Sequence, residues 1–290
     1  MNLLTKFNLV CVSVFAIALV AAGVVSYTVL QNNARGEVTR QARLMMETAL
    51  ASRDYTSRNV KPLLNDKLAE RFLPETVPAF AATQSMQYLQ KNYPDFSYKE
   101  ATLNPTNRRD LAKGYEVNVV KAFRRDAKAR EILGIRDTPR GQFIYLSRPI
   151  RITDSQCLAC HSTPKVAPAS MLKKYGDKHG FGWKLNEVVG AQIVSVPTHL
   201  PYRLAGRTFH TLMLALLSVF VVTLLIINVM LRRLVIAPVT HLSQVADDIS
   251  MGRLESADLP VKGEDEIATL TGSFNRMQRS LQQALKLLER

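Results

Sequence analysis

The sequence predicts an α+β domain held between two membrane-spanning helices and followed by an all-α coiled coil. Three observations predict this arrangement. Two long stretches of the 290-residue chain contain no charged residue, short strand and helix patterns alternate between them, and apolar residues recur every three or four positions after the second stretch. Mixed short elements bracketed by long helices favour an α+β domain over a helical bundle or a β-sandwich.

The two uncharged stretches cover residues 9–30 and residues 208–231. Each is long enough to cross the hydrocarbon core of a bilayer, about 30 Å thick, as a helix. The first stretch could instead belong to a cleaved signal peptide, because residues 1–8 carry a lysine and small residues follow at positions 21–23. Its apolar run exceeds the roughly 7 to 15 residues typical of a signal peptide, which favours an uncleaved anchor. We therefore expect a two-pass protein in contact with the lipid bilayer.

The segment between the two spans, residues 31–207, predicts a mixture of helices and strands. A helix is expected over residues 31–57, where Val38, Ala42, Met45 and Ala49 form one apolar stripe. Further helices are expected over residues 75–91 and 108–130. Strand patterns occupy residues 96–103, 142–152 and 188–196. The turn-rich residues 162–183 are expected to form a loop wrapped over another part of the domain.

The positive charge of the chain is concentrated in this middle segment. Residues 31–207 contain 29 Lys and Arg residues against 16 Asp and Glu residues, and they carry nearly all of the net charge of +14. A segment bounded by two spans on the exported side of a membrane would not meet nucleic acid, so no nucleic-acid partner is expected. The basic charge could instead bind acidic ligands or anionic lipid headgroups, or it could simply form a solvated surface.

The most specific motif of the chain has the spacing that attaches a c-type haem. Two thiols separated by two residues can each add to one haem vinyl group, and a histidine directly after the second thiol can bind the iron. One covalently attached haem c is therefore the expected cofactor. The residues expected to hold it are Cys157, Cys160 and His161.

Two other uses of a Cys-x-x-Cys pair fit this chain less well. A structural zinc site needs about four ligands, whereas the chain has three cysteines, one of which, Cys11, lies in the first apolar stretch. A thioredoxin-like dithiol requires a βαβ setting, whereas this pair follows a predicted strand and is followed by His161 and Pro164.

The haem motif also sets the orientation in the membrane. Basic residues flank both spans on both sides, so their distribution alone does not decide the topology. Haem attachment of this type takes place outside the bacterial cytoplasm. We therefore expect a bacterial inner-membrane protein with residues 31–207 in the periplasm and both termini in the cytoplasm.

The C-terminal part, residues 232–290, carries two short apolar seams joined by a connector. Neither seam can bury its stripe alone, so a partner chain is expected. This part resembles a HAMP domain, which implies a parallel four-helix coiled coil formed by a homodimer. The matching residues are Pro238, Gly252-Arg253-Leu254, Leu259 and Val261, Asp265-Glu266-Ile267 and Phe274-Asn275-Arg276-Met277, and the seams comprise Val235, Val239, Leu242, Ala246 and Ile249, then Ile267, Leu270, Phe274, Met277, Leu281, Ala284 and Leu288.

Residues 31–207 resemble a family of membrane-anchored periplasmic haem-c sensor domains with a PAS-like fold. The resemblance rests on the haem motif together with Asn104-Pro105-Thr106-Asn107, Tyr145 to Ile150, Gly180-Phe181-Gly182-Trp183 and Val189-Gly190-Ala191. Some members use a cysteine upstream of the Asn-Pro motif as the sixth iron ligand, and this chain has none there. We expect Met45 or Met46 to bind the iron instead, because a thioether is a soft ligand for ferrous iron. Met86, His179 and water are the alternatives.

These observations predict a sensor rather than an enzyme. The haem would detect the redox state or a diatomic gas such as NO, CO or O2, and the membrane helices would pass the change to the HAMP-like module. The alternative is a membrane-anchored cytochrome that only carries electrons, which has no evident need for that module. The sequence ends at Arg290, just after the second seam. The output is therefore expected from a cytoplasmic partner such as a kinase or a chemoreceptor.

Overall fold

The computed structural model describes residues 2–68, 70–253, 258–261 and 263–288. Two compact units are present, one formed by Tyr27–Thr208 and the other by Met1–Ser26 together with Phe209–Arg290. Leu254 of the HAMP-like motif and the terminal Arg290 lie outside the described residues.

Helix α1 (Leu3–Tyr55) includes both the first apolar stretch and the helix predicted over residues 31–57. It continues through the π-helical turn η1 (Thr56–Val60) into α2 (Lys61–Leu68). The wider turn comes directly before Pro62, which has no N–H to donate to the preceding turn. The backbone N–H of Lys61 instead donates to the carbonyl of Thr56, five residues back.

A four-stranded antiparallel sheet forms the centre of the middle unit, with the strand order β1-β4-β3-β2. The strands are β1 (Ser97–Thr102), β2 (Ile132–Thr138), β3 (Gly141–Arg151) and β4 (Val188–Pro197). The three predicted strands correspond to β1, β3 and β4, and the α+β class is confirmed. The edge strand β2 was not predicted, because Gly134, Arg136 and Asp137 weaken its apolar alternation.

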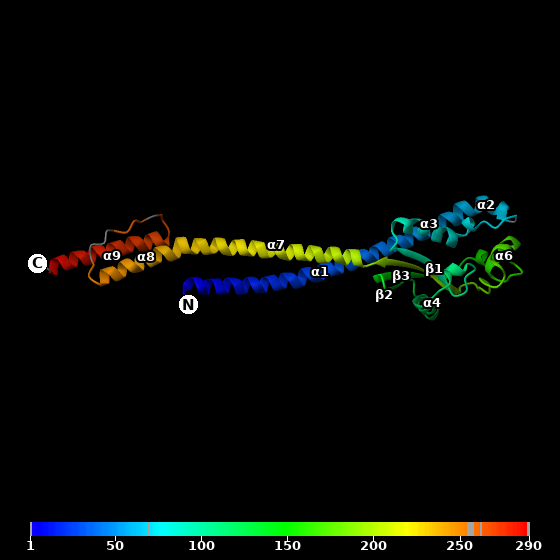
Figure 1. Ribbon diagram of the computed structural model, residues 1–290, viewed down its shortest axis with the longest axis horizontal. Coiled ribbons are helices and arrows are strands. Elements are labelled where there is room, and N and C mark those ends of the chain that lie inside the picture. The colour runs from blue at the N-terminus through cyan, green and yellow to red at the C-terminus, as the bar shows by residue number, and fades with distance from the viewer. Residues whose placement is uncertain (1, 69, 254–257, 262, 289–290) are drawn as a thin grey trace. The chain divides into compact units, whose positions relative to one another are not determined.

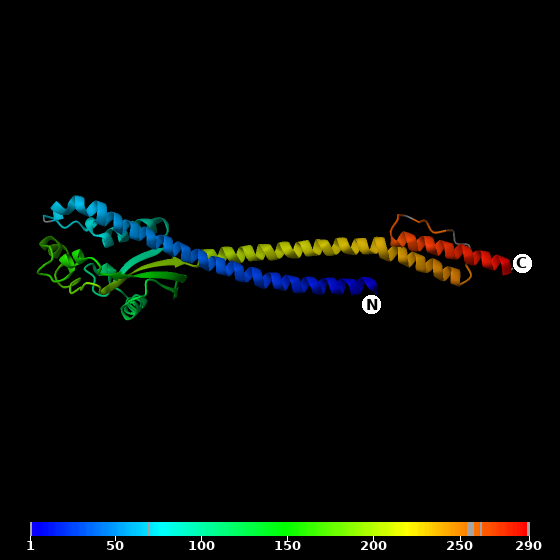
Figure 2. The same ribbon diagram turned by 180° about the vertical axis from the view of Figure 1, so that it is seen from behind.

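Helices cover both faces of the sheet (Figure 1). On one face, α1 and α3 (Pro78–Asn92) enclose a cluster that includes Val38, Met46, Ala82, Tyr98, Leu146 and Val194. On the other face, α4 (Tyr115–Arg125) packs Val120 and Phe123 against Ala191 and Ile193 of β4. The view from behind shows the same two layers (Figure 2). The tight packing of both faces keeps the sheet in one fixed register.

The polar helix expected over residues 108–130 is shorter in the structure. Its first part is the 3₁₀ turn η3 (Arg108–Asp110), and α4 begins only at Tyr115. Gly114 has a φ of 54° and a ψ of −121°, which no helix contains. The prediction was therefore wrong in extent, because the backbone leaves the helical region at this glycine.

The other unit contains two helices that are long and apolar enough to cross a membrane, as judged over the described residues. Within it, α1 pairs with α7 (His199–Leu231). Asn8 and Asn228 exchange two side-chain hydrogen bonds of 2.8 Å, and the Phe15 and Phe220 rings lie 4.1 Å apart. The reciprocal amide pair satisfies polar groups that would otherwise face an apolar surrounding.

The C-terminal module begins after the π-helical turn η5 (Arg232–Ile236) and contains α8 (Ala237–Ser250) and α9 (Glu266–Leu288). Asn275 of α9 forms two hydrogen bonds with Leu259 of the connector between α8 and α9. Its side chain accepts from the Leu259 N–H at 3.0 Å and donates to the Leu259 carbonyl at 2.8 Å. Several apolar residues of the second seam remain exposed within the single chain, namely Leu270, Met277 and Leu281.

Candidate functional site

The haem-attachment motif lies on two short consecutive helical turns, η4 (Ser155–Cys157) and α5 (Leu158–His161). Asp154 begins the first turn, because its carboxylate accepts a hydrogen bond of 2.8 Å from the backbone N–H of Gln156. Cys157 and Cys160 are both free thiols. Residues three apart on a helical turn share a face, so the two thiols are presented together with His161 directly after them.

The orientation of His161 is fixed by two neighbours from the segment around residue 180. Its Nδ1 lies 2.7 Å from the carbonyl oxygen of Gly180, and its ring stacks on Trp183 with centroids 3.8 Å apart and planes 12° apart. Because a carbonyl can only accept, Nδ1 carries the proton and Nε2 is left as a free acceptor. Burial lowers the pKa of His161, which keeps the ring neutral. A neutral imidazole with a free Nε2 is the form that binds a metal.

The predicted loop over residues 162–183, which contains α6 (Ala169–Tyr175), is held against the motif by Asn104. The Asn104 carboxamide accepts from the Gly180 N–H at 3.3 Å and donates to the Phe181 carbonyl at 3.4 Å. Gly180 adopts a φ of +85°, and a Cβ there would lie 2.9 Å from the Cα of Thr106. The Asn-Pro motif therefore positions the loop that positions His161, a role that the sequence did not reveal.

Two basic residues approach the motif, Arg53 from the last turn of α1 and Lys61 from the start of α2. Burial raises the pKa of Cys157, as does the charge of Asp154, and the positive charge of Arg53 offsets part of this rise. Lys61 donates to Gln156 at 3.2 Å, and its charge offsets part of the rise that burial causes in the pKa of Cys160. Arg53 follows Ala49 of the predicted stripe by four positions, which is the signal that could have identified it, and Lys61 follows Arg53 by eight.

Arg53 also takes part in an enclosed polar group with β1. Its Nη1 donates to Glu100 Oε1 at 2.6 Å, and the Tyr98 hydroxyl donates to the same oxygen at 2.9 Å. The Glu100 side chain is only 5% exposed, whereas that of Arg53 is 26% exposed. The pKa of Arg53 is raised overall, although burial lowers it, because Glu100 favours the charged form. The group attaches the end of α1 to the sheet beside the haem motif.

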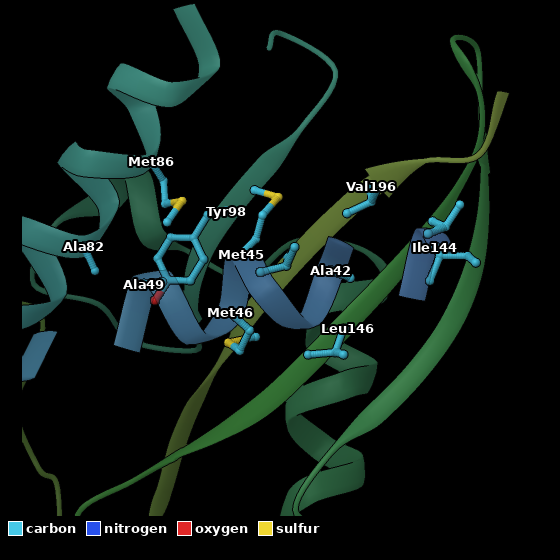
Figure 3. Packing of buried hydrophobic residues seen from close by; sticks show 12 residues of the cluster. Ala42, Met45, Met46, Ala49, Ala82, Met86, Tyr98, Ile144, Leu146 and Val196 are labelled. Carbon is cyan, nitrogen blue, oxygen red and sulfur yellow. The ribbon is translucent and has the colours of Figure 1, made fainter. Parts of the chain in front are cut away.

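Met45 and Met46 lie in the apolar cluster between α1 and the sheet (Figure 3). Met46 is fully buried near Leu146, and Met86 of α3 lies beside the Tyr98 ring. Arg53 is the residue of α1 that lies near Cys157, and it follows Met45 by eight positions. That interval corresponds to about 12 Å along a helix. The structure brings Cys157, Cys160 and His161 together, and places the methionines in the core and His179 on the surface.

The donor set of the motif fits a covalently attached haem. Two free thiols are available for the vinyl groups, and His161 has Nε2 free for the iron. Arg53 and Lys61 supply positive charge beside the thiols, which partly offsets the rise that burial causes in the pKa of Cys157 and Cys160.

Two protein-family models match separate parts of the chain. Residues 31–197 match the Tll0287-like family, and residues 230–283 match the HAMP domain family. The methyl-accepting chemotaxis protein CtpM of Pseudomonas aeruginosa is 27% identical over 176 residues, which cover 56% of this chain and 31% of the relative. This chain therefore spans about a third of that relative's length.

Among solved structures, the cyanobacterial haem protein Tll0287 matches with 17% identity and a TM-score of 0.41, covering 52% of this chain and 92% of the other. The family match alone extends over more than half of the sequence, and the HAMP match follows the second apolar helix. The chain therefore belongs to the Tll0287-like family, with a HAMP domain following its sensor domain.

Proposed function

We propose that this chain is a membrane-bound haem-c sensor. It detects the redox state or a diatomic gas in the periplasm and signals through its HAMP domain to a cytoplasmic partner such as a kinase or chemoreceptor. The observation that carries the proposal is the geometry of His161, whose Nδ1 faces the Gly180 carbonyl and leaves Nε2 free beside two thiols. The proposed topology has two inner-membrane spans, a periplasmic haem domain and cytoplasmic termini.

The HAMP match supports signalling rather than electron transport alone. HAMP domains connect membrane sensors to cytoplasmic output, and the relative CtpM is by name a chemotaxis receptor. A haem at the motif would supply an iron whose oxidation state and axial ligands can change. The protein's own residues then hold His161 through the Gly180 carbonyl and the Trp183 ring, and Arg53 joins the motif region to β1. No catalytic role is proposed.

Covalent attachment is tested with the cysteines of the chain. The purified native protein is expected to retain haem-dependent peroxidase staining on a denaturing gel, because thioether bonds survive denaturation. Cys157→Ala together with Cys160→Ala should remove the stain completely. Cys11→Ala is the matched control, because Cys11 lies in the first membrane helix, and it should stain like the native protein. Staining that persists in the double variant would refute the haem-c assignment.

For the sixth iron ligand, we propose Met45 or Met46. Both are buried, so replacement by alanine would open a cavity in the core, whereas leucine conserves the volume at a cost of less than about 1.5 kcal/mol. Met45→Leu or Met46→Leu is expected to remove the methionine-to-iron charge-transfer band from the ferric absorption spectrum. A band that is missing from the native protein, or unchanged in both variants, rules these residues out.

We also propose a parallel homodimer formed through the HAMP domain. Leu270 and Met277 of α9 are 50% and 59% exposed in the single chain, and a second copy would bury them. Leu270→Cys and Met277→Cys are each expected to crosslink to the same residue of a second copy in the membrane. Arg276→Cys, an exposed position beside the seam, should crosslink far less. Equal crosslinking at all three positions would contradict this seam.

A further inference from the structure

A cavity of about 300 Å³ lies at the β1 edge of the sheet, lined by residues of α3, η3 and α4 as well as of the strands. The paired residues Ser97 and Ser195 of β1 and β4 line it, together with Tyr115, the first residue of α4. It is separate from the haem motif, because none of Cys157, Cys160 and His161 lines it. Its volume is at the lower end of the range of small-molecule sites, about 300 to 1,000 Å³.

Three basic side chains line the cavity, and one of them has no acidic partner. Lys99 is paired with Glu116 at 2.6 Å, and Arg109 lies 3.4 Å from Asp110. No Asp or Glu within the described part of the chain forms an ion pair with Arg136. The paired cations and anions cancel, so Arg136 leaves the cavity with a net positive charge.

The hydrogen-bonding capacity of both arginines is also incompletely used. Arg109 Nε and Arg136 Nε are buried and make no hydrogen bond to the described residues, since the approach of Arg109 to Asp110 lacks hydrogen-bond geometry. A buried donor without a partner costs about 1 to 3 kcal/mol, and native proteins contain few of them. Arg109 Nε still lies 3.4 Å from an oxygen of Asp110, whereas Arg136 has no acidic partner among the described residues, so the unused donor of Arg136 indicates that a partner binds there.

Aromatic rings hold the Arg136 guanidinium in place. Its central carbon lies 4.6 Å from the centroid of Tyr115 and 5.9 Å from that of Phe143. Stacking engages the face of a guanidinium and leaves its N–H groups, which lie in the plane, available. The rings therefore fix the direction of the donor edge, which lowers the entropy cost of binding a ligand.

We propose that this cavity binds a small carboxylate, with Arg136 as the main anchor and Arg109 as a second donor. A planar guanidinium edge matches the two oxygens of a carboxylate. The hydroxyl groups of Ser97, Tyr115 and Ser195 provide hydrogen-bond partners for the rest of a small polar molecule. The site goes beyond the proposed haem function and would give the domain a second input.

Isothermal titration of the full-length protein in detergent tests the site with acetate, lactate, succinate and benzoate as probes. At least one carboxylate is expected to bind with a stoichiometry of one per chain, and its neutral amide should not bind. Arg136→Gln should weaken binding at least tenfold. Arg140→Gln is the matched control, because Arg140 is exposed on the turn between β2 and β3 and does not line the cavity. It should bind like the native protein.

Three outcomes would overturn the proposal: no binding of any probe at millimolar concentration, native affinity in Arg136→Gln, or equal binding of sulfate. If Arg136→Gln does not fold, Arg136→Lys replaces it in the test. Lysine retains the positive charge but cannot form bidentate hydrogen bonds to a carboxylate, so this variant should also bind at least tenfold more weakly. The haem spectrum is recorded for each variant. Lost carboxylate binding with an unchanged spectrum separates this site from the haem assignment.

Discussion

Gly180→Ala is expected to displace His161 and change the absorption spectrum of the haem protein. Gly180 has a φ of +85°, which a side chain rarely adopts, and its Cβ would lie 2.9 Å from the Cα of Thr106. The loop must therefore move away from Thr106, and the carbonyl that holds Nδ1 of His161 moves with it. We expect a loss of the native axial-ligand spectrum while the gel stain remains, because the proposed thioether bonds of Cys157 and Cys160 would not depend on this loop.

Gly176→Ala is the control that separates the effect of a clash with Thr106 from the effect of a side chain at a positive φ. Gly176 has a φ of +79°, but nothing lies within 4 Å of the position of its Cβ. This variant should lose about 1 kcal/mol of stability from the strained angle and keep the native spectrum. If both variants gave the native spectrum, the packing of Gly180 on Thr106 would not position His161.

Arg53→Met is expected to destabilise the sensor domain by about 3 kcal/mol, because it leaves the nearly buried carboxylate of Glu100 without its cation. The Tyr98 hydroxyl would then be the remaining side-chain donor to Glu100. Adding Glu100→Gln should recover part of the loss, since the double variant has no unpaired buried charge. Chemical denaturation followed by circular dichroism measures the three free energies of unfolding.

Arg58→Met provides the matched control on the same stretch of helix. Arg58 pairs with Asp54, but their side chains are 76% and 57% exposed. An exposed pair of this spacing contributes about 0.3 to 0.5 kcal/mol, so its loss should be barely measurable. A cost for Arg53→Met as small as that for Arg58→Met would mean that the group with Glu100 and Tyr98 does not stabilise the domain.

Helix α1 carries both a candidate membrane span and Arg53 in one uninterrupted helix, Leu3–Tyr55. Arg53 on this helix lies near Cys157, and Lys61 on the segment beyond it donates to Gln156 beside the motif. The π-helical turn between the two basic residues is a local irregularity of a kind that is frequent at functional sites.

The sequence by itself determined the features that depend on short intervals along the chain. Uncharged stretches indicated both long apolar helices, and the alternation of apolar residues predicted the positions of β1, β3 and β4. The spacing of Cys157, Cys160 and His161 identified the motif, the apolar seams after residue 232 predicted a coiled coil, and the resemblance of this part to a HAMP domain is confirmed by the family match. These signals are local, because the periodicity of a helix or a strand and the spacing of a motif depend on residues that are close together in the sequence.

Only the tertiary structure decided which distant residues meet. The tautomer of His161 depends on a carbonyl 19 positions away, and Arg53 meets Glu100 across 47 positions. Strand β2 gains its regular structure from pairing with β3 rather than from its own weak pattern, as Arg136 and Phe143 illustrate. The cavity around Arg136 forms where β1, β4 and α4 come together. Such contacts follow from packing the whole chain, and no interval within the sequence encodes them.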